Sequence, residues 1–185
     1  MKKTMLSLAV LAFAFAAFSP ASRLITKNGH VVFFSHTPVE DITANNYKVT
    51  GTIDPSSGEV VFSVPMQAFE FEKALMQEHF NGKDFLNTKA FPKAKFQGKI
   101  TDLSAIHFNQ DGSYTAAVAG DLTLKDVTNP VSANGTITVN GSTVTVEAKF
   151  PIALADYGIV FKKGKPSTNI AKSVDVTVKA EYQPE

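Results

Sequence analysis

The sequence contains no cysteine and no tryptophan among its 185 residues. Without cysteine, the chain can form neither a disulfide bond nor a lipid anchor on an N-terminal cysteine, and cysteine nucleophiles are excluded as well. Phenylalanine is abundant, with 15 residues. The aromatic content is therefore apolar, which suits the lining of a protein interior better than the stacking of nucleic-acid bases.

The chain also has little that indicates catalysis or metal binding. Its four histidines are scattered, without the His-x-His or His-x-x-x-His spacing of zinc sites, so we expect them on the surface or at a rim. No Gly-x-Ser-x-Gly motif is present. The segment 158–165, GIVFKKGK, differs from a phosphate loop because five residues separate its glycines and Pro166 follows in place of Ser or Thr. We therefore predict no enzymatic activity, no catalytic residue, no metal and no cofactor.

The N-terminal residues 1–21 differ from the rest of the chain. Lys2 and Lys3 precede an apolar run over residues 5–18, and the small residues Ser19 and Ala21 follow at the spacing of a signal-peptidase site. The run is shorter than the roughly 20 apolar residues of a membrane-spanning helix. We expect a cleaved signal peptide, export to the periplasm, and one domain over residues 22–185.

The formal charge is nearly balanced, with 18 basic and 17 acidic residues. Loss of Lys2 and Lys3 with the signal peptide leaves 16 basic residues against the same 17 acidic ones. No basic surplus remains, so we expect no nucleic-acid partner.

Alternation of apolar and polar residues predicts eight strands in the rest of the chain. Asn28-Gly29, 128–130 and Asn140-Gly141 are typical turn sequences. A period near 3.6 predicts one helix over residues 70–80, which Gly82 would end in the left-handed conformation. The predicted strands cover residues 30–36, 47–53, 60–66, 94–100, 114–124, 131–139, 144–150 and 170–182.

Each of these strands has one apolar face, and closing the sheet on itself both buries those faces and removes exposed edges. The fold class is therefore all-β, as an antiparallel up-and-down barrel of about eight strands with one short helix. A membrane-spanning barrel would be apolar outside, but here the alternate faces are charged. The charged residues on those faces are Lys95, Lys99, Asp121, Glu147, Lys149, Asp175 and Lys179.

Small residues recur on the inward faces and leave two interpretations open. They could leave unfilled volume for one apolar ligand, or they could mark positions where strands bend or cross closely. The small residues are Gly51, Gly98, Ala116, Gly120, Ala133, Gly135 and Ala148.

Three segments resemble the YceI-like family. HFNGKDFLNTKAFPKAKF, over 79–96, is similar to the family's helix-to-strand segment, and AGDLTLKDVTNPVSANGTITV, over 119–139, is similar to its Gly-x-Leu-Thr hairpin. Residues 156–159, Asp-Tyr-Gly-Ile, resemble its late Asp-Phe-Gly-Ile loop. The resemblance implies a lipocalin-like periplasmic barrel that carries a polyisoprenoid or another long amphiphile in a central tunnel.

We accordingly expect a small hydrophobic ligand as partner, and we leave the oligomeric state open, with a dimer possible. Lys162, Lys163 and Lys165 are candidate contacts for a ligand head group. The alternatives are a solidly packed interaction or stress-response module, and a lipid head-group hydrolase that uses Asp84 and Asp156. The predicted tunnel wall consists of Val31, Phe33, Val49, Gly51, Phe62, Val64, Phe71, Leu75, Phe85, Phe96, Gly98, Ala116, Val118, Gly120, Leu122, Ala133, Gly135, Ile137, Val146, Ala148, Val176 and Val178.

Overall fold

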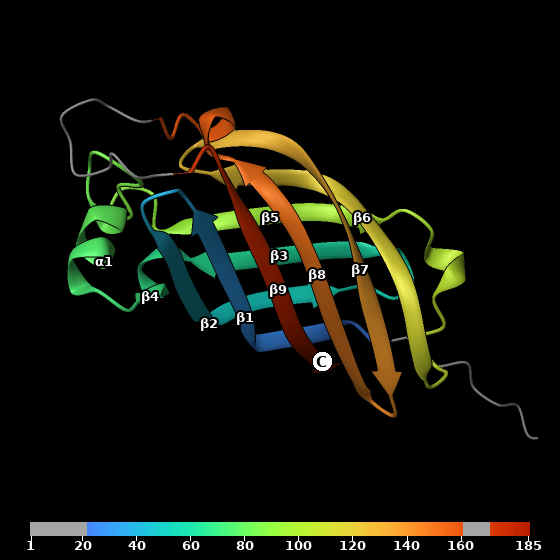
Figure 1. The fold of residues 1–185 in the computed structure, drawn as a ribbon. Helices are drawn as coiled ribbons and strands as arrows, with labels where there is room; N and C mark the ends of the chain where they lie inside the picture. Colours follow the sequence, from blue (N-terminus) through green and yellow to red (C-terminus); the bar gives the residue numbers. More distant parts are fainter. Residues whose placement is uncertain (1–21, 161–170) are drawn as a thin grey trace, which may run out of the picture.

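The alternating segments form a closed antiparallel barrel in the computed structural model, which describes residues 22–160 and 171–185 (Figure 1). The predicted signal peptide, Lys162, Lys163 and Lys165 lie outside these residues. The strands are β1 (Leu24–His36), β2 (Asp41–Ile53), β3 (Glu59–Pro65), β4 (Glu70–Phe71), β5 (Lys93–Ile100), β6 (Gly112–Leu124), β7 (Val127–Asn140), β8 (Thr143–Ala153) and β9 (Ser173–Pro184). The helices are α1 (Ala74–Asn81) and the short 3-10 turns η1 (Met66–Ala68), η2 (Leu103–Ala105) and η3 (Leu154–Tyr157).

Closure of the barrel comes from β1, which pairs with β9 on one side and β2 on the other. The order along the sheet is β1-β9-β8-β7-β6-β5-β3-β2, and every pairing is antiparallel. The two-residue strand β4 pairs only with β2, outside this ring. The predicted barrel of eight long strands is thus confirmed.

Side chains alternate between the interior and the surface as the sequence pattern predicts. On β7, Ala133 and Ile137 are buried, whereas Asn134 and Thr138 between and beside them are exposed. Lysines and acids pair across the outer face of β8 and β9, where Lys179 lies 2.6 Å from Glu147. The apolar face therefore points inward and the charged face is solvated.

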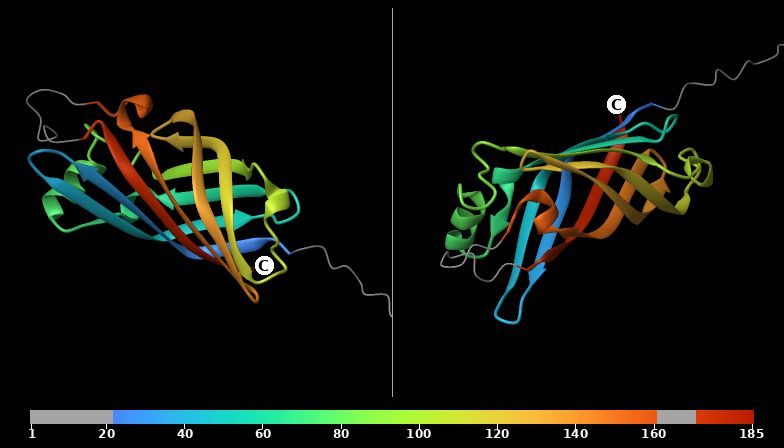
Figure 2. Two further views of the ribbon diagram at one scale, coloured as in Figure 1. Left: turned by 45° about the vertical axis from the view of Figure 1, so that its right-hand side comes forward. Right: turned by 90° about the horizontal axis from the view of Figure 1, so that it is seen from above.

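The two ends of the barrel are built differently (Figure 2). The helix α1 lies at one end and η2 at the opposite end. The η2 end is filled by a tight cluster that contains Ile53, Val139, Val144 and Tyr182, all at most 2% exposed. Among the described helices, α1 included, none is long and apolar enough to cross a membrane.

Two predicted turns are wrong. Asn28-Gly29 lies inside β1, where the pairing with β2 shifts register on both sides of Gly29, so the residue pair forms an irregularity within a strand. Pro130 lies within β7, opposite Asp121, and the turn is made earlier by Lys125 and Asp126, with φ of 50° and 66°. The predicted turn at Asn140-Gly141 does join β7 to β8, and Gly141 has φ of 58°.

The predicted helix begins too early and ends differently from the prediction. Residues 70–71 form β4, and α1 begins only at Ala74. Gly82 caps the helix with φ of −64° and ψ of 155°, an extended conformation, whereas Asn87 further on has φ of 47°. Thr88 holds the following loop to the helix, because its hydroxyl donates to Asn81 Oδ1 at 2.6 Å. The end of α1 is therefore fixed by side-chain hydrogen bonding and does not use a glycine in the left-handed region.

The strands β2 and β3 diverge, and a buried asparagine bridges the gap between them. Their pairing covers only residues 50–53 of β2, although the strand extends from Asp41. The Asn46 side chain is fully buried; its Nδ2 donates to Pro65 O at 2.8 Å, and its Oδ1 accepts from Lys48 N at 3.0 Å. The amide thus hydrogen-bonds to the last residue of β3 and to the backbone of its own strand, β2.

The strands β5 and β6 approach each other most closely at a pair of glycines. Gly98 lies opposite Gly120 in the β5–β6 register. A methyl group on Gly120 would collide with Gln97 O and Gly98 Cα, and one on Gly98 would lie 2.6 Å from Ala119 O. For these positions the interpretation as sites of close strand approach is correct.

We predict that Asn46→Ala lowers the free energy of unfolding by about 1–3 kcal/mol, because it removes both hydrogen bonds that the buried amide makes to the backbone. Chemical denaturation measures the change. Asn134→Ala, an exposed position on β7, is the control and should stay within about 0.5 kcal/mol of wild type. Equal stability of the two variants would contradict the bridging role.

We predict that Gly120→Ala costs about 3 kcal/mol, at the upper end of the range for overpacking, because backbone atoms of β5 must move. Gly82→Ala is the matched control. Gly82 has negative φ, and its nearest neighbour would lie 3.2 Å from the added methyl. Thermal unfolding of the two variants should differ clearly, and a Gly120→Ala variant as stable as Gly82→Ala would refute the close approach.

Candidate functional site: an apolar cavity inside the barrel

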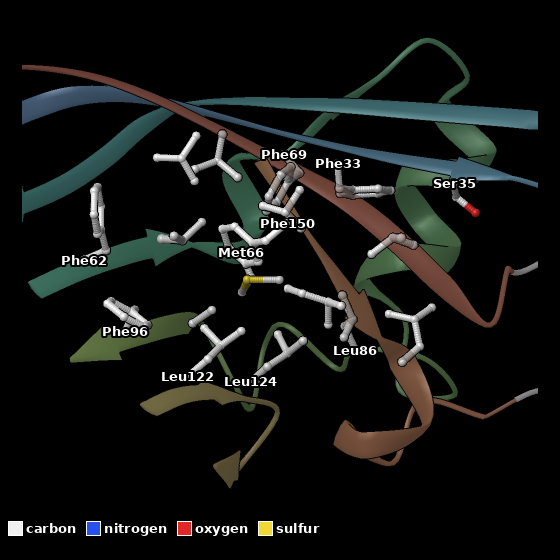
Figure 3. A pocket seen from close by; sticks show the side chains of 18 of the residues that line it. Phe33, Ser35, Phe62, Met66, Phe69, Leu86, Phe96, Leu122, Leu124 and Phe150 are labelled. Carbon is white, nitrogen blue, oxygen red and sulfur yellow. The ribbon is translucent and has the colours of Figure 1, made fainter. Parts of the chain in front are cut away.

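A cavity of about 730 Å³ lies inside the barrel. All eight long strands contribute to its wall, together with η1, β4 and α1. The side chains drawn in Figure 3 are almost entirely hydrocarbon, with one methionine sulfur and one serine oxygen among them. The volume falls within the range of about 300–1,000 Å³ that is common for small-molecule sites, so the barrel interior holds a cavity of ligand size and is not a filled core.

Phenylalanines close the α1 end of the cavity. The ring of Phe80 on α1 is stacked on Phe33 of β1 with centroids 5.6 Å apart, and it contacts Phe71 at 5.0 Å and Phe69 at 5.4 Å. Phe85 completes this phenylalanine cluster at 6.2 Å from Phe80. Because α1 presents Phe80 to the barrel, the helix is held over this end by aromatic packing.

Phe85 and Leu86 differ in burial, although they are adjacent in the loop after α1. Phe85 is half-buried and lines the cavity, whereas its neighbour Leu86 is 5% exposed. The loop after α1 therefore places Leu86 in the core and leaves Phe85 at the cavity edge.

Polar lining residues gather at the same end. Glu40 and Lys73 form an ion pair of 2.6 Å that joins the turn between β1 and β2 to the start of α1, and this hydrogen bond raises the pKa of Lys73. The strand residues that line the cavity are apolar, apart from Ser35 and Thr136. The polar lining residues at the α1 end are Ser35, Glu40, Lys73, Glu78, His79, Lys83 and Asp84.

Three buried hydroxyl groups have no hydrogen-bond partner within the described residues, namely those of Ser35, Tyr157 and Tyr182. Burial raises the pKa of both tyrosines, so their phenols stay neutral. Neither tyrosine borders the cavity, whereas Ser35 does. Ser35 is thus the one of the three that lies on the cavity.

The structure places all but four of the predicted wall residues on the cavity. Leu75 lines the cavity as predicted, although the residue is 61% exposed. The exceptions are Val49, Gly51, Gly98 and Gly120. The three glycines lie where strands approach closely; at Gly51, an added methyl would lie 2.9 Å from Val61 O. Their small size brings backbones together and leaves no ligand space.

The remaining small residues behave differently. Ala116, Ala133 and Ala148 line the cavity, as does Gly135, where an added methyl would also meet Glu147 O of β8. The alanines therefore fit the interpretation that small side chains leave volume. Gly135 both borders the cavity and allows close approach of β7 and β8.

Several wall residues were missed by the sequence analysis. Phe150 continues the alternation of its strand and could have been included on that signal. Met66 ends the predicted strand 60–66 and continues its alternation, so it too could have been included. Phe69 and Leu86 lie in loops, where no periodicity indicates which way a side chain points. Ser35 carries no apolar signal at all.

The residues considered for head-group chemistry do not converge. Asp84 borders the cavity near α1, whereas Asp156 is exposed in η3 and does not line it. Nor do residues 22–160 and 171–185 contain a group of three His, Asp or Glu side chains that could hold a metal ion. The described part of the site offers apolar contact and a polar rim.

The sequence matches the YceI-like domain over residues 23–182. It is 29% identical to a UPF0312 protein of Pseudomonas fluorescens, covering 92% of this chain and 93% of that protein. A UPF0312 protein of Yersinia pestis is 28% identical, with 91% and 92% covered.

Solved structures show the same fold. A polyisoprenoid binding domain from Saccharophagus degradans superposes with a TM-score of 0.75 at 14% identity, covering 90% of this chain and all of that one. BcnA of Burkholderia cenocepacia superposes with a TM-score of 0.67 at 19% identity, covering 83% of this chain and 95% of that one. The domain match spans nearly the whole described barrel, and the chain belongs to the YceI-like family.

Proposed function

We propose that this protein binds a long apolar chain, such as a polyisoprenoid, an isoprenoid quinone or a fatty-acid-like amphiphile, and carries or sequesters it inside the barrel. The observation that carries the proposal is the cavity of about 730 Å³, walled by aliphatic and phenylalanine side chains. Binding is non-covalent, since the ligand needs only to be enclosed.

Burial of hydrocarbon alone supplies enough free energy for such binding. Each buried methylene contributes about 0.8 kcal/mol, so a chain of about 20 methylenes gains on the order of 16 kcal/mol. Association costs an estimated 4–15 kcal/mol in lost freedom. The balance favours ligands that fill the length of the cavity over short ones.

The comparisons support the same ligand class. The Saccharophagus degradans structure, which has the same fold, is a polyisoprenoid binding domain. A solidly packed interaction module is disfavoured by the unfilled volume, and a head-group hydrolase is disfavoured because Asp84 and Asp156 do not share a site.

The proposed setting is the periplasm, to which residues 1–21 would direct export as a signal peptide before their cleavage. The support is the order of Lys2-Lys3, apolar run and small residues in that segment. A carrier in an aqueous compartment must shield its ligand from water, and the closed wall meets that need.

Mass spectrometry of a solvent extract tests the proposal directly. Protein purified without detergent should release an apolar long-chain species in near-stoichiometric amount. A matched extract of a small, solidly packed periplasmic protein controls for carry-over. A clean extract, together with no displacement of a fluorescent long-chain probe by added isoprenoids, would overturn the proposal.

We predict that Ala133→Leu leaves the stability of the ligand-free protein nearly unchanged, within about 1 kcal/mol, because the added side chain enters cavity space. It should weaken binding of a fluorescent long-chain probe several-fold by occupying that space. Ser132→Leu adds bulk at the neighbouring exposed position and should leave probe binding unchanged. Severe destabilisation by Ala133→Leu would mean that no ligand space exists at this position.

A further inference from the structure

Ser35 combines burial with an unused hydroxyl group. It is the last inward-facing residue of β1, opposite Ile42 of β2, and its side chain is 4% exposed. Its hydroxyl has no partner among the described residues, whereas Asn46 and Thr88, which are also buried, both have one. An unpaired buried polar group is costly, so its presence requires an explanation.

The position of Ser35 connects this hydroxyl to the ligand space. Val31, Phe33 and Ser35 follow one another on the inner face of β1, and all three line the cavity. Figure 3 shows Ser35 at the α1 end, where its oxygen is the only one among the labelled side chains. Ser35 is therefore the hydrogen-bonding side chain that follows the apolar residues on the inner face of β1.

Charges at this end do not favour an anionic ligand group. The acidic lining residues are Glu40, Glu78 and Asp84. The basic ones in the described part of the chain are Lys73 and Lys83, and Lys73 is already paired with Glu40. These described side chains therefore offer no surplus of positive charge to a phosphate or carboxylate, whereas a neutral oxygen needs none.

We infer that Ser35 forms a head-group subsite for a neutral hydroxyl or carbonyl oxygen at the end of the apolar chain, which places that end beneath α1 and the chain toward η2. The inference rests on the proposed function. The Ser35 oxygen is covered in the structure, and the inference requires a change of its side-chain rotamer that turns the oxygen toward the cavity. The bound ligand supplies the partner that the hydroxyl lacks.

The test compares farnesol with the hydrocarbon of the same skeleton that lacks the hydroxyl. Each displaces a neutral fluorescent naphthylamine dye from the wild-type protein and from Ser35→Ala. We expect Ser35→Ala to weaken farnesol about three- to tenfold, the effect of one hydrogen bond, and to leave the hydrocarbon unchanged. The melting temperature of the ligand-free variant should be equal to or above that of wild type, because the unpaired hydroxyl is removed.

Val31→Ala is the matched control on the same face of β1. It removes apolar contact and should weaken farnesol and the hydrocarbon by the same factor. An equal loss for both ligands in Ser35→Ala, or a lowered melting temperature, would show that Ser35 only packs and would overturn the inference. Tighter binding of farnesyl phosphate than of farnesol would also overturn it, since the preferred head group would then be anionic.

The same data separate this inference from the proposed function. If both ligands bind and Ser35→Ala changes neither, the subsite is refuted and the carrier function stands. If neither farnesol nor the hydrocarbon displaces the dye from wild type, the proposed function fails and the subsite fails with it.

Discussion

The pairing of β1 with both β9 and β2 is the constraint on which the rest of the structure depends. It converts a sheet with two edges into a ring, so that the apolar faces of all strands point toward one another. A ring of eight strands encloses a space that side chains can either fill or leave open. The interior of this protein does both, because it is filled at the η2 end and open toward α1.

This division explains how the barrel remains stable around unfilled volume. Tyr182, Ile53 and their neighbours form a close-packed cluster at one end, and close packing is where burial contributes most. In the wall, Gly98 and Gly120 bring β5 and β6 together, while Asn46 joins β2 to the last residue of β3. The open region is thus bounded by elements that are held together by contacts within the protein.

Polarity changes along the axis of the cavity, and this change gives the site a direction. Aliphatic side chains and phenylalanines line most of the wall, whereas Ser35, the Glu40–Lys73 pair and the charged face of α1 gather at one end. An amphiphile has the same asymmetry, so its apolar chain and its polar end each match a different part of the cavity. The phenylalanine cluster around Phe80 covers that polar end and would have to yield, at least in part, for a long ligand to enter.

The sequence by itself determined the fold class and the inward face of the barrel, because alternation with period two specifies which side chains share a face whatever the neighbouring strand is. Most of the predicted wall followed from that rule. Only the tertiary structure decided which small residues border a cavity: Ala133 and Gly120 look alike in the pattern, but one lies beside open space and the other against the backbone of β5. The same holds for Leu86 and Ser35, since a loop residue and an unpaired hydroxyl acquire their roles from neighbours distant in the chain, and periodicity carries no information about those neighbours.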